Sequence, residues 1–161
     1  MHFAGEYRKA GLHVRTSVMK ISDAALRNNA AAIRARIPGK VKLMCVVKAD
    51  AYGHGSVPAA RDMLQAGADA FAVAIVEEAA VLRNAGIDVP ILILGGAGAD
   101  SLREAVALDV SQAVYTTDAL DVLQAEAARL GRRAPTDPLA RPAQPGGPGA
   151  PSEPGEVGEV G

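Results

Sequence analysis

Short apolar runs alternate with amphipathic helical patterns four times between residues 41 and 130. Each run is short enough to be a strand buried on both faces, as parallel strands are, and each is followed by apolar residues at helical spacing. The runs cover residues 41–47, 70–75, 91–94 and 110–115. The connections between them are too short for anything but parallel crossover units. The pattern therefore predicts an α/β fold, a partial (β/α)8 (TIM-type) barrel of about four βα units.

A further helix is predicted ahead of the first of these strands. Leu26, Ala30, Ile33 and Ile37 recur at helical spacing, and Pro38-Gly39 would end the helix. Ser22 or Asp23 stands where a side-chain oxygen can cap its amino end.

Lys48 directly follows the first run, and the chain then breaks into a turn spaced by Gly53 and Gly55. An apolar strand has no packing use for an ammonium group at its end, although a lysine there can also simply extend to solvent. In a barrel this position lies at the carboxyl ends of the strands, where active sites are built. An amine freed of its proton attacks a carbonyl to form an imine, and Lys48 is therefore the candidate nucleophile.

Period-two alternation in the same run separates two faces. Met44, Val46 and Lys48 fall on one face, which would point into the barrel, while Cys45 and Val47 fall on the other and would pack under helices. Cys45 is interpreted as a small buried hydrophobe rather than as a nucleophile. One cysteine in the chain excludes an internal disulfide.

The residues from Val46 to Gly55, Val-Val-Lys-Ala-Asp-Ala-Tyr-Gly-His-Gly, resemble the pyridoxal-phosphate attachment signature of alanine racemases. Further segments stand in the order that this family has. They are Leu26-Arg27-Asn28-Asn29, Gln65-Ala66-Gly67-Ala68-Asp69, Val76-Glu77-Glu78-Ala79 and Pro90-Ile91-Leu92-Ile93-Leu94-Gly95. The resemblance covers residues 13–134 and implies the amino-terminal, partial-barrel domain of a racemase.

The resemblance also implies roles for individual residues. Lys48 would hold pyridoxal 5'-phosphate covalently and move the Cα proton of alanine, and Tyr52 would hydrogen-bond the cofactor phosphate. Leu94 would pack near the cofactor, although on sequence alone it is equally well a core leucine, and Tyr52 can be read as a half-buried turn residue. The family works as a homodimer, in which a tyrosine of the partner subunit serves as the second base.

Other polar residues near the motif receive structural interpretations. Asp50 is expected to hold the turn through backbone hydrogen bonds. Glu77 and Glu78 are interpreted as solvated charge at a helix start. His54 has no neighbouring Cys or His cluster, so no metal site is predicted.

Composition excludes several classes of partner. Formal net charge is −1, with 17 basic and 18 acidic residues mixed along the chain, so no basic stripe for nucleic acid is present. No segment approaches the roughly 20 apolar residues of a membrane span, and the amino terminus has no signal-peptide pattern. We therefore expect a cytoplasmic protein that binds neither nucleic acid nor membrane.

Pro and Gly dominate residues 135–161, and such a segment cannot recover its ordering entropy by burial. We expect a disordered tail in place of the family's next strand, which carries a substrate-binding arginine in a segment containing Asp-Thr-Gly-Met. The expectation is a truncated alanine racemase, inactive alone, whose full-length relatives make D-alanine for cell-wall peptide. A racemase of another amino acid such as serine, and a non-catalytic cofactor-binding or interaction fragment, are the alternatives.

Overall fold

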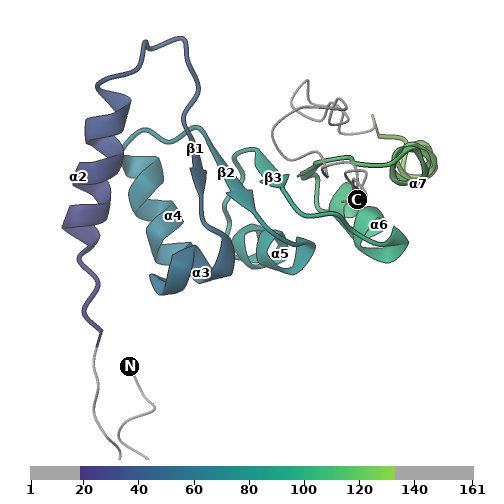
Figure 1. The fold of residues 1–161 in the computed structure, drawn as a ribbon, viewed down its shortest axis with the longest axis horizontal. Coiled ribbons are helices and arrows are strands. Elements are labelled where there is room, and N and C mark those ends of the chain that lie inside the picture. The colour runs from purple at the N-terminus through teal and green to yellow at the C-terminus, as the bar shows by residue number, and fades with distance from the viewer. Residues whose placement is uncertain (1–18, 133–161) are drawn as a thin grey trace, which may run out of the picture.

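Four parallel strands form the centre of the structure, a computed structural model that describes residues 19–132 (Figure 1). They lie side by side in chain order, so that each crossover returns to the neighbouring position in the sheet. The strands are β1 (Met44–Val46), β2 (Ala70–Val73), β3 (Ile91–Ile93) and β4 (Ser111–Gln112). Residues 13–18 and 133–134 of the predicted domain, and the predicted disordered tail, residues 135–161, lie outside the described residues.

A helical segment follows each strand, and one helix precedes the sheet. They are α2 (Asp23–Arg34), α3 (Lys48–Gly53), α4 (Ser56–Gln65), α5 (Val76–Asn84), α6 (Ala99–Ala107) and α7 (Thr117–Arg129). In Figure 1, α2 lies beyond α4 at the β1 end of the sheet, and α6 and α7 lie at the β4 end. The alternation confirms the predicted βα units. Among the described residues, no helix is both long and apolar enough to cross a membrane.

Each strand is shorter than its apolar run. The first run was predicted as a strand over residues 41–47, but only Met44–Val46 pair with β2. The last run, residues 110–115, contributes only Ser111–Gln112 to the sheet. Helix boundaries shift in the same way, since α2 ends at Arg34, ahead of Pro38-Gly39. Hydrogen-bonding partners limit the strands, and local apolar composition does not report where those partners end.

The sheet register confirms the predicted faces of β1. Val46 is aligned with Ala72, which is aligned with Leu92, so these side chains share one face. Val46 is 41% exposed on that face, whereas Val47, of the opposite set, is fully buried. Cys45 packs against the core between sheet and helices, and burial raises the pKa of its thiol.

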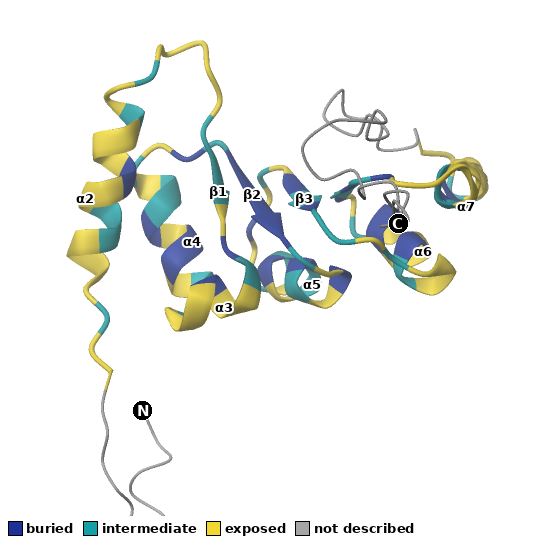
Figure 2. Ribbon diagram, in the orientation of Figure 1, coloured by how far each residue is buried: buried dark blue, intermediate teal, exposed yellow. Residues whose placement is uncertain are grey.

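The main core lies between the sheet and the helices on its covered face. Phe71, Val73, Ile91 and Ile93 supply the sheet side, and small residues of α4 and α5 such as Ala60 and Ala79 allow the helices to approach closely. Figure 2 shows β2 buried along its length, while much of α2 is exposed. A second cluster of apolar residues joins α6 to α7.

Cap residues follow the sequence signals only in part. The side chain of Ser22 accepts a hydrogen bond from the Ala25 amide, as predicted for the amino end of α2. From its side-chain type Asp100 could also cap the helix that follows β3, but it does not cap α6. Gly98 occupies the cap position, and Asp100 instead accepts a hydrogen bond from Arg103 at 2.7 Å.

Asp69 joins the amino ends of β1 and β2. Its carboxylate accepts hydrogen bonds from the Leu43 amide at 2.8 Å, from Lys42 Nζ at 3.2 Å and from Arg34 at 3.2 Å. Gly67 precedes it with φ +95°, and a Cβ there would lie 3.0 Å from Arg34 Cγ. The Gln65–Asp69 segment therefore serves to start two strands against α2.

We predict that Asp69→Asn weakens the fall in stability at acid pH. The Leu43 amide and the Lys42 ammonium hold the pKa of the Asp69 carboxyl below its usual 3.8. Between that lowered value and 3.8 the unfolded chain binds more protons, so stability is complete above the unfolded pKa and is lost as pH falls through the folded one. The melting temperature of Asp69→Asn should therefore change less over this interval than that of the wild type.

The control for this measurement is Asp88→Asn, because Asp88 is exposed and the described structure gives it no hydrogen bond. Thermal unfolding of the three proteins from pH 6 to pH 2.5 makes the comparison. Parallel curves for Asp69→Asn and the wild type would contradict the assigned role of Asp69.

Candidate active site at the carboxyl edge of the sheet

Lys48 lies at the carboxyl edge of the sheet, two residues beyond the end of β1. Val47 lies between the end of β1 and Lys48. It is fully buried, and its amide donates a hydrogen bond to the carbonyl of Ala72 at 2.9 Å. Lys48 itself is half-buried and begins α3. The strand-end position predicted for Lys48 is thus displaced by one residue, while its edge of the sheet is as predicted.

The turn after Lys48 is left-handed. Four consecutive residues, Ala49 to Tyr52, have φ between 51° and 56°. For L-residues this conformation costs about 1–2 kcal/mol each relative to the right-handed one, and runs of it are rare. Strained backbone of this kind is typical of functional sites, where the surrounding structure imposes it. The sequence indicated a turn here, but not its hand.

Local hydrogen bonds support this turn from both ends. The Ala51 amide donates to the Val47 carbonyl at 2.9 Å, and the Gly55 amide donates to the Asp50 carbonyl at 2.9 Å. The Asp50 side chain accepts from the Ser56 amide at 2.6 Å, at the start of α4. The structural role predicted for Asp50 is therefore confirmed.

His54 participates in the same turn. Its Nδ1 lies 2.8 Å from the Ala51 carbonyl oxygen, a local contact. Within residues 19–132, no three His, Cys, Asp or Glu side chains gather closely enough to hold a metal ion.

Tyr52 and Leu94 lie on two different elements at the same edge. Tyr52 is 60% exposed on the turn, and neither its hydroxyl nor the Lys48 amine has a hydrogen-bond partner among the described residues. Leu94 follows β3 and is half-buried. It comes two residues after Leu92 and so belongs to the face that carries Val46. The three predicted site residues thus belong to the carboxyl ends of β1 and β3.

Three further residues at this edge were not found from the sequence. Glu78 accepts hydrogen bonds from two backbone amides, and it is therefore not the solvated charge that we predicted. Tyr115 donates its hydroxyl to the Leu94 carbonyl at 2.7 Å. Gln112 is buried and donates to the Gly95 carbonyl at 2.6 Å. Glu78 could have been found from the sequence, because it lies in a segment that resembles alanine racemases. No pattern in the sequence indicated Tyr115 or Gln112.

A family model described as the alanine racemase N-terminal domain matches residues 21–136. The chain belongs to the alanine racemase family.

Individual relatives agree with that assignment. Alanine racemase 1 of Oceanobacillus iheyensis is 42% identical over 120 residues, which cover 74% of this chain and 32% of that protein. An alanine racemase of Synechocystis is 49% identical over 89 residues, or 55% of this chain and 24% of that protein. The chain thus spans about a third or less of the length of these relatives.

Solved structures show the same fold. The alanine racemase of a D-cycloserine-producing Streptomyces lavendulae superposes with a TM-score of 0.65 at 43% identity, over 70% of this chain and 29% of that one. The Bacillus anthracis alanine racemase with bound L-Ala-P gives a TM-score of 0.59 at 42% identity, over 62% and 26%. These likenesses confirm the predicted partial TIM-type barrel.

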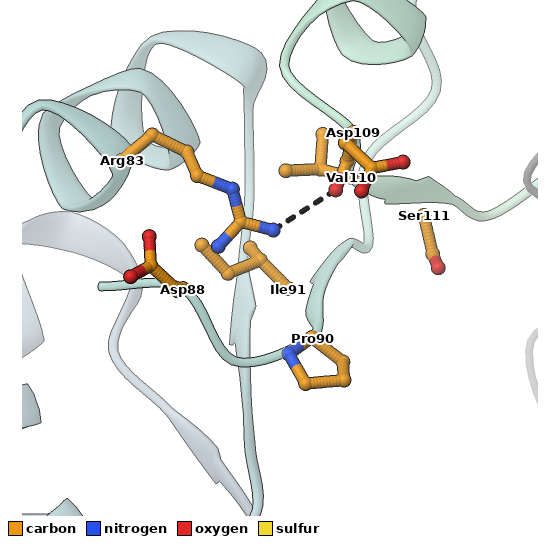
Figure 3. Close-up of a pocket in the computed structure, with 7 residues that line it drawn as sticks. All are labelled: Arg83, Asp88, Pro90, Ile91, Asp109, Val110 and Ser111. Atoms are coloured by element: carbon orange, nitrogen blue, oxygen red, sulfur yellow. Dashed lines mark hydrogen bonds between the residues drawn. The ribbon is translucent and has the colours of Figure 1, made fainter. Parts of the chain in front are cut away.

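A pocket at the other edge of the sheet has a structural origin. It encloses about 250 Å³ beside Pro90 and Ser111, at the amino ends of β3 and β4, and Arg83 extends into it (Figure 3). The guanidinium of Arg83 is already engaged, because it donates to four backbone carbonyls at 2.6–3.1 Å, those of Ile87, Val89, Leu108 and Asp109. Arg83 therefore joins loops at the amino edge, and four of its five N–H donors are already used for that purpose.

We predict that Ala49→Gly stabilises the protein, by about 0.5–1 kcal/mol. Ala49 is exposed at φ 51°, so glycine relieves backbone strain and removes no packing, against a smaller entropic cost in the unfolded chain. Urea unfolding measures the change. The matched control is Ala31→Gly, exposed in right-handed α2, which should lose about 1 kcal/mol. Equal losses in both variants would show that the turn is not left-handed in solution.

Proposed function

We propose that this chain carries the cofactor-attachment part of a pyridoxal-phosphate-dependent alanine racemase, with Lys48 as the attachment residue. The proposed domain extends over residues 13–134. The proposal rests on one observation above the others: Lys48 stands at the carboxyl edge of the sheet, on a strained turn, inside a family whose members are named alanine racemases.

The chemistry of the residues present fits pyridoxal phosphate. An amine, a phenol and an apolar side chain come from the same edge of the sheet, at Lys48, Tyr52 and Leu94. The amine and the phenol are unengaged within the described residues, unlike Arg83 at the opposite edge. Lys48 would hold the cofactor covalently, the Tyr52 hydroxyl would donate to its phosphate, and Leu94 would pack near it.

Lys48 Nζ is the proposed base. When bound, the cofactor ring supplies an electron sink for negative charge at the substrate Cα. The Lys48 amine would take the Cα proton of alanine on its own side, or return it there. The left-handed turn fixes the backbone from which this amine extends, so that its reach is set by side-chain torsions alone. Positioned groups of this kind contribute about 10²–10⁴-fold to rate.

The complete reaction needs groups beyond those described. Exchange of configuration at Cα requires a second base on the opposite face, and the family resemblance places it on a partner subunit in a homodimer. We propose alanine as the substrate because the relatives are alanine racemases. A cytoplasmic supply of D-alanine for cell-wall peptide belongs to the same proposal.

The test is covalent trapping at Lys48. The full chain is incubated with pyridoxal phosphate, reduced with borohydride, digested and mapped by mass spectrometry. We expect the label on Lys48 and its loss in Lys48→Arg, because a guanidinium does not form the link. Lys40→Arg, at an exposed position ahead of β1, is the control and should retain the label. A label spread evenly over all lysines would refute the proposed site.

A second prediction concerns Tyr52. Tyr52→Phe removes one hydrogen bond to a charged group, which is worth about 1.5–3 kcal/mol, so affinity for pyridoxal phosphate should fall about ten- to a hundredfold. Fluorescence titration with pyridoxal, which lacks the phosphate, is the matched control and should give the same affinity in both proteins. A parallel loss for both ligands would assign Tyr52 to the turn and not to the phosphate.

A further inference from the structure

Glu78 joins β1 and β2 at the point where the two strands separate. Its Oε1 accepts a hydrogen bond from the Ala49 amide at 2.6 Å, and its Oε2 accepts one from the Ala74 amide at 2.7 Å. Ala49 follows Lys48 directly, and Ala74 follows the end of β2. One half-buried carboxylate on the first turn of α5 therefore holds amides from two different chain segments.

These two amides are the donors that the parallel ladder would use next. The ladder includes a bond from the Val47 amide to the Ala72 carbonyl. Its continuation would pair the Ala74 amide with the Val47 carbonyl, and then the Ala49 amide with the Ala74 carbonyl. In the structure Glu78 accepts from both donors instead.

The two carbonyls released from the ladder find other donors. The Val47 carbonyl accepts from the Ala51 amide at 2.9 Å, which begins the left-handed turn. The Ala74 carbonyl accepts from the Gly95 amide at 3.0 Å, which extends pairing towards β3. The two amides and the two carbonyls that leave the ladder are thus all satisfied where β1 separates from β2.

We propose that Glu78 is the positioning residue of Lys48. The amide of Ala49 belongs to the peptide group that begins with the Lys48 carbonyl, so the carboxylate fixes the backbone on the carboxyl side of Lys48. It also compensates the strained turn, whose first residue is Ala49. The inference has two parts. The structural half is that Glu78 holds the amides of Ala49 and Ala74, and it does not depend on the proposed function. The chemical half is that this positions Lys48 for cofactor attachment, and it rests on the proposed function.

The variant Glu78→Gln keeps the size of the side chain but removes its charge and one of its two acceptor oxygens. An amide side chain has one acceptor oxygen, so it satisfies one backbone donor and directs its own NH2 group at the other. The matched control is Glu77→Gln, the neighbouring exposed carboxylate on the same helical turn, for which the described structure gives no hydrogen bond.

Two measurements on the full chain test the proposal. Amide hydrogen exchange by NMR should show exchange about ten- to a hundredfold faster at Ala49 or Ala74 in Glu78→Gln, with Phe71 and Leu94 unchanged. Borohydride trapping with pyridoxal phosphate should show the ratio of Lys48 label to Lys40 label falling about tenfold. Glu77→Gln should match the wild type in both.

Two outcomes overturn the proposal. One is an unchanged label ratio in Glu78→Gln. The other is fast exchange throughout the sheet, which would make Glu78 a residue of general stability. If the wild type itself shows no preference for Lys48, the proposed function fails. The exchange rates then decide the structural half: fast exchange confined to Ala49 or Ala74 supports it, and unchanged rates refute it.

Discussion

Burial of β2 on both faces is the constraint on which the described structure depends. All four residues from Ala70 to Val73 are buried, with Phe71 and Val73 fully so. A strand in this position has no water for its backbone groups, so it must pair along both edges. β1 and β3 take their register from it, and the face on which each of their side chains lies follows.

The two edges of the sheet show different uses of polar side chains. At the amino edge, Asp69 and Arg83 direct their charged groups at backbone atoms and bring loops together. At the carboxyl edge, Glu78 accepts from two backbone amides, whereas Lys48 and Tyr52 have no side-chain hydrogen-bond partner among the described residues. At both edges these charged groups bond to the backbone, and a structural role follows for each of them.

The segments that resemble alanine racemases include residues with a structural role and residues with a proposed chemical role. Arg27, in the segment before the first strand, pairs with Asp62 at 2.5 Å and joins α2 to α4. Gly95 is required because a Cβ there would lie 2.5 Å from the Ala74 carbonyl oxygen, in the ladder between β2 and β3. Several of the segments that resemble alanine racemases therefore contain residues that pack the helices and strands of the half-barrel together. The decamer that contains Lys48 carries the proposed chemistry.

The sequence by itself determined the order of strands and helices, the faces of β1, the restriction of the cap to Ser22 or Asp23, and the backbone role of Asp50. Each of these depends on residues close together in the chain, through period, propensity or a local hydrogen bond. The tertiary structure alone decided the ends of the strands, the hand of the turn and the role of Glu78. Glu78 is 29 residues from Ala49, and its amide partners become available only where two strands separate, so no local pattern contains them.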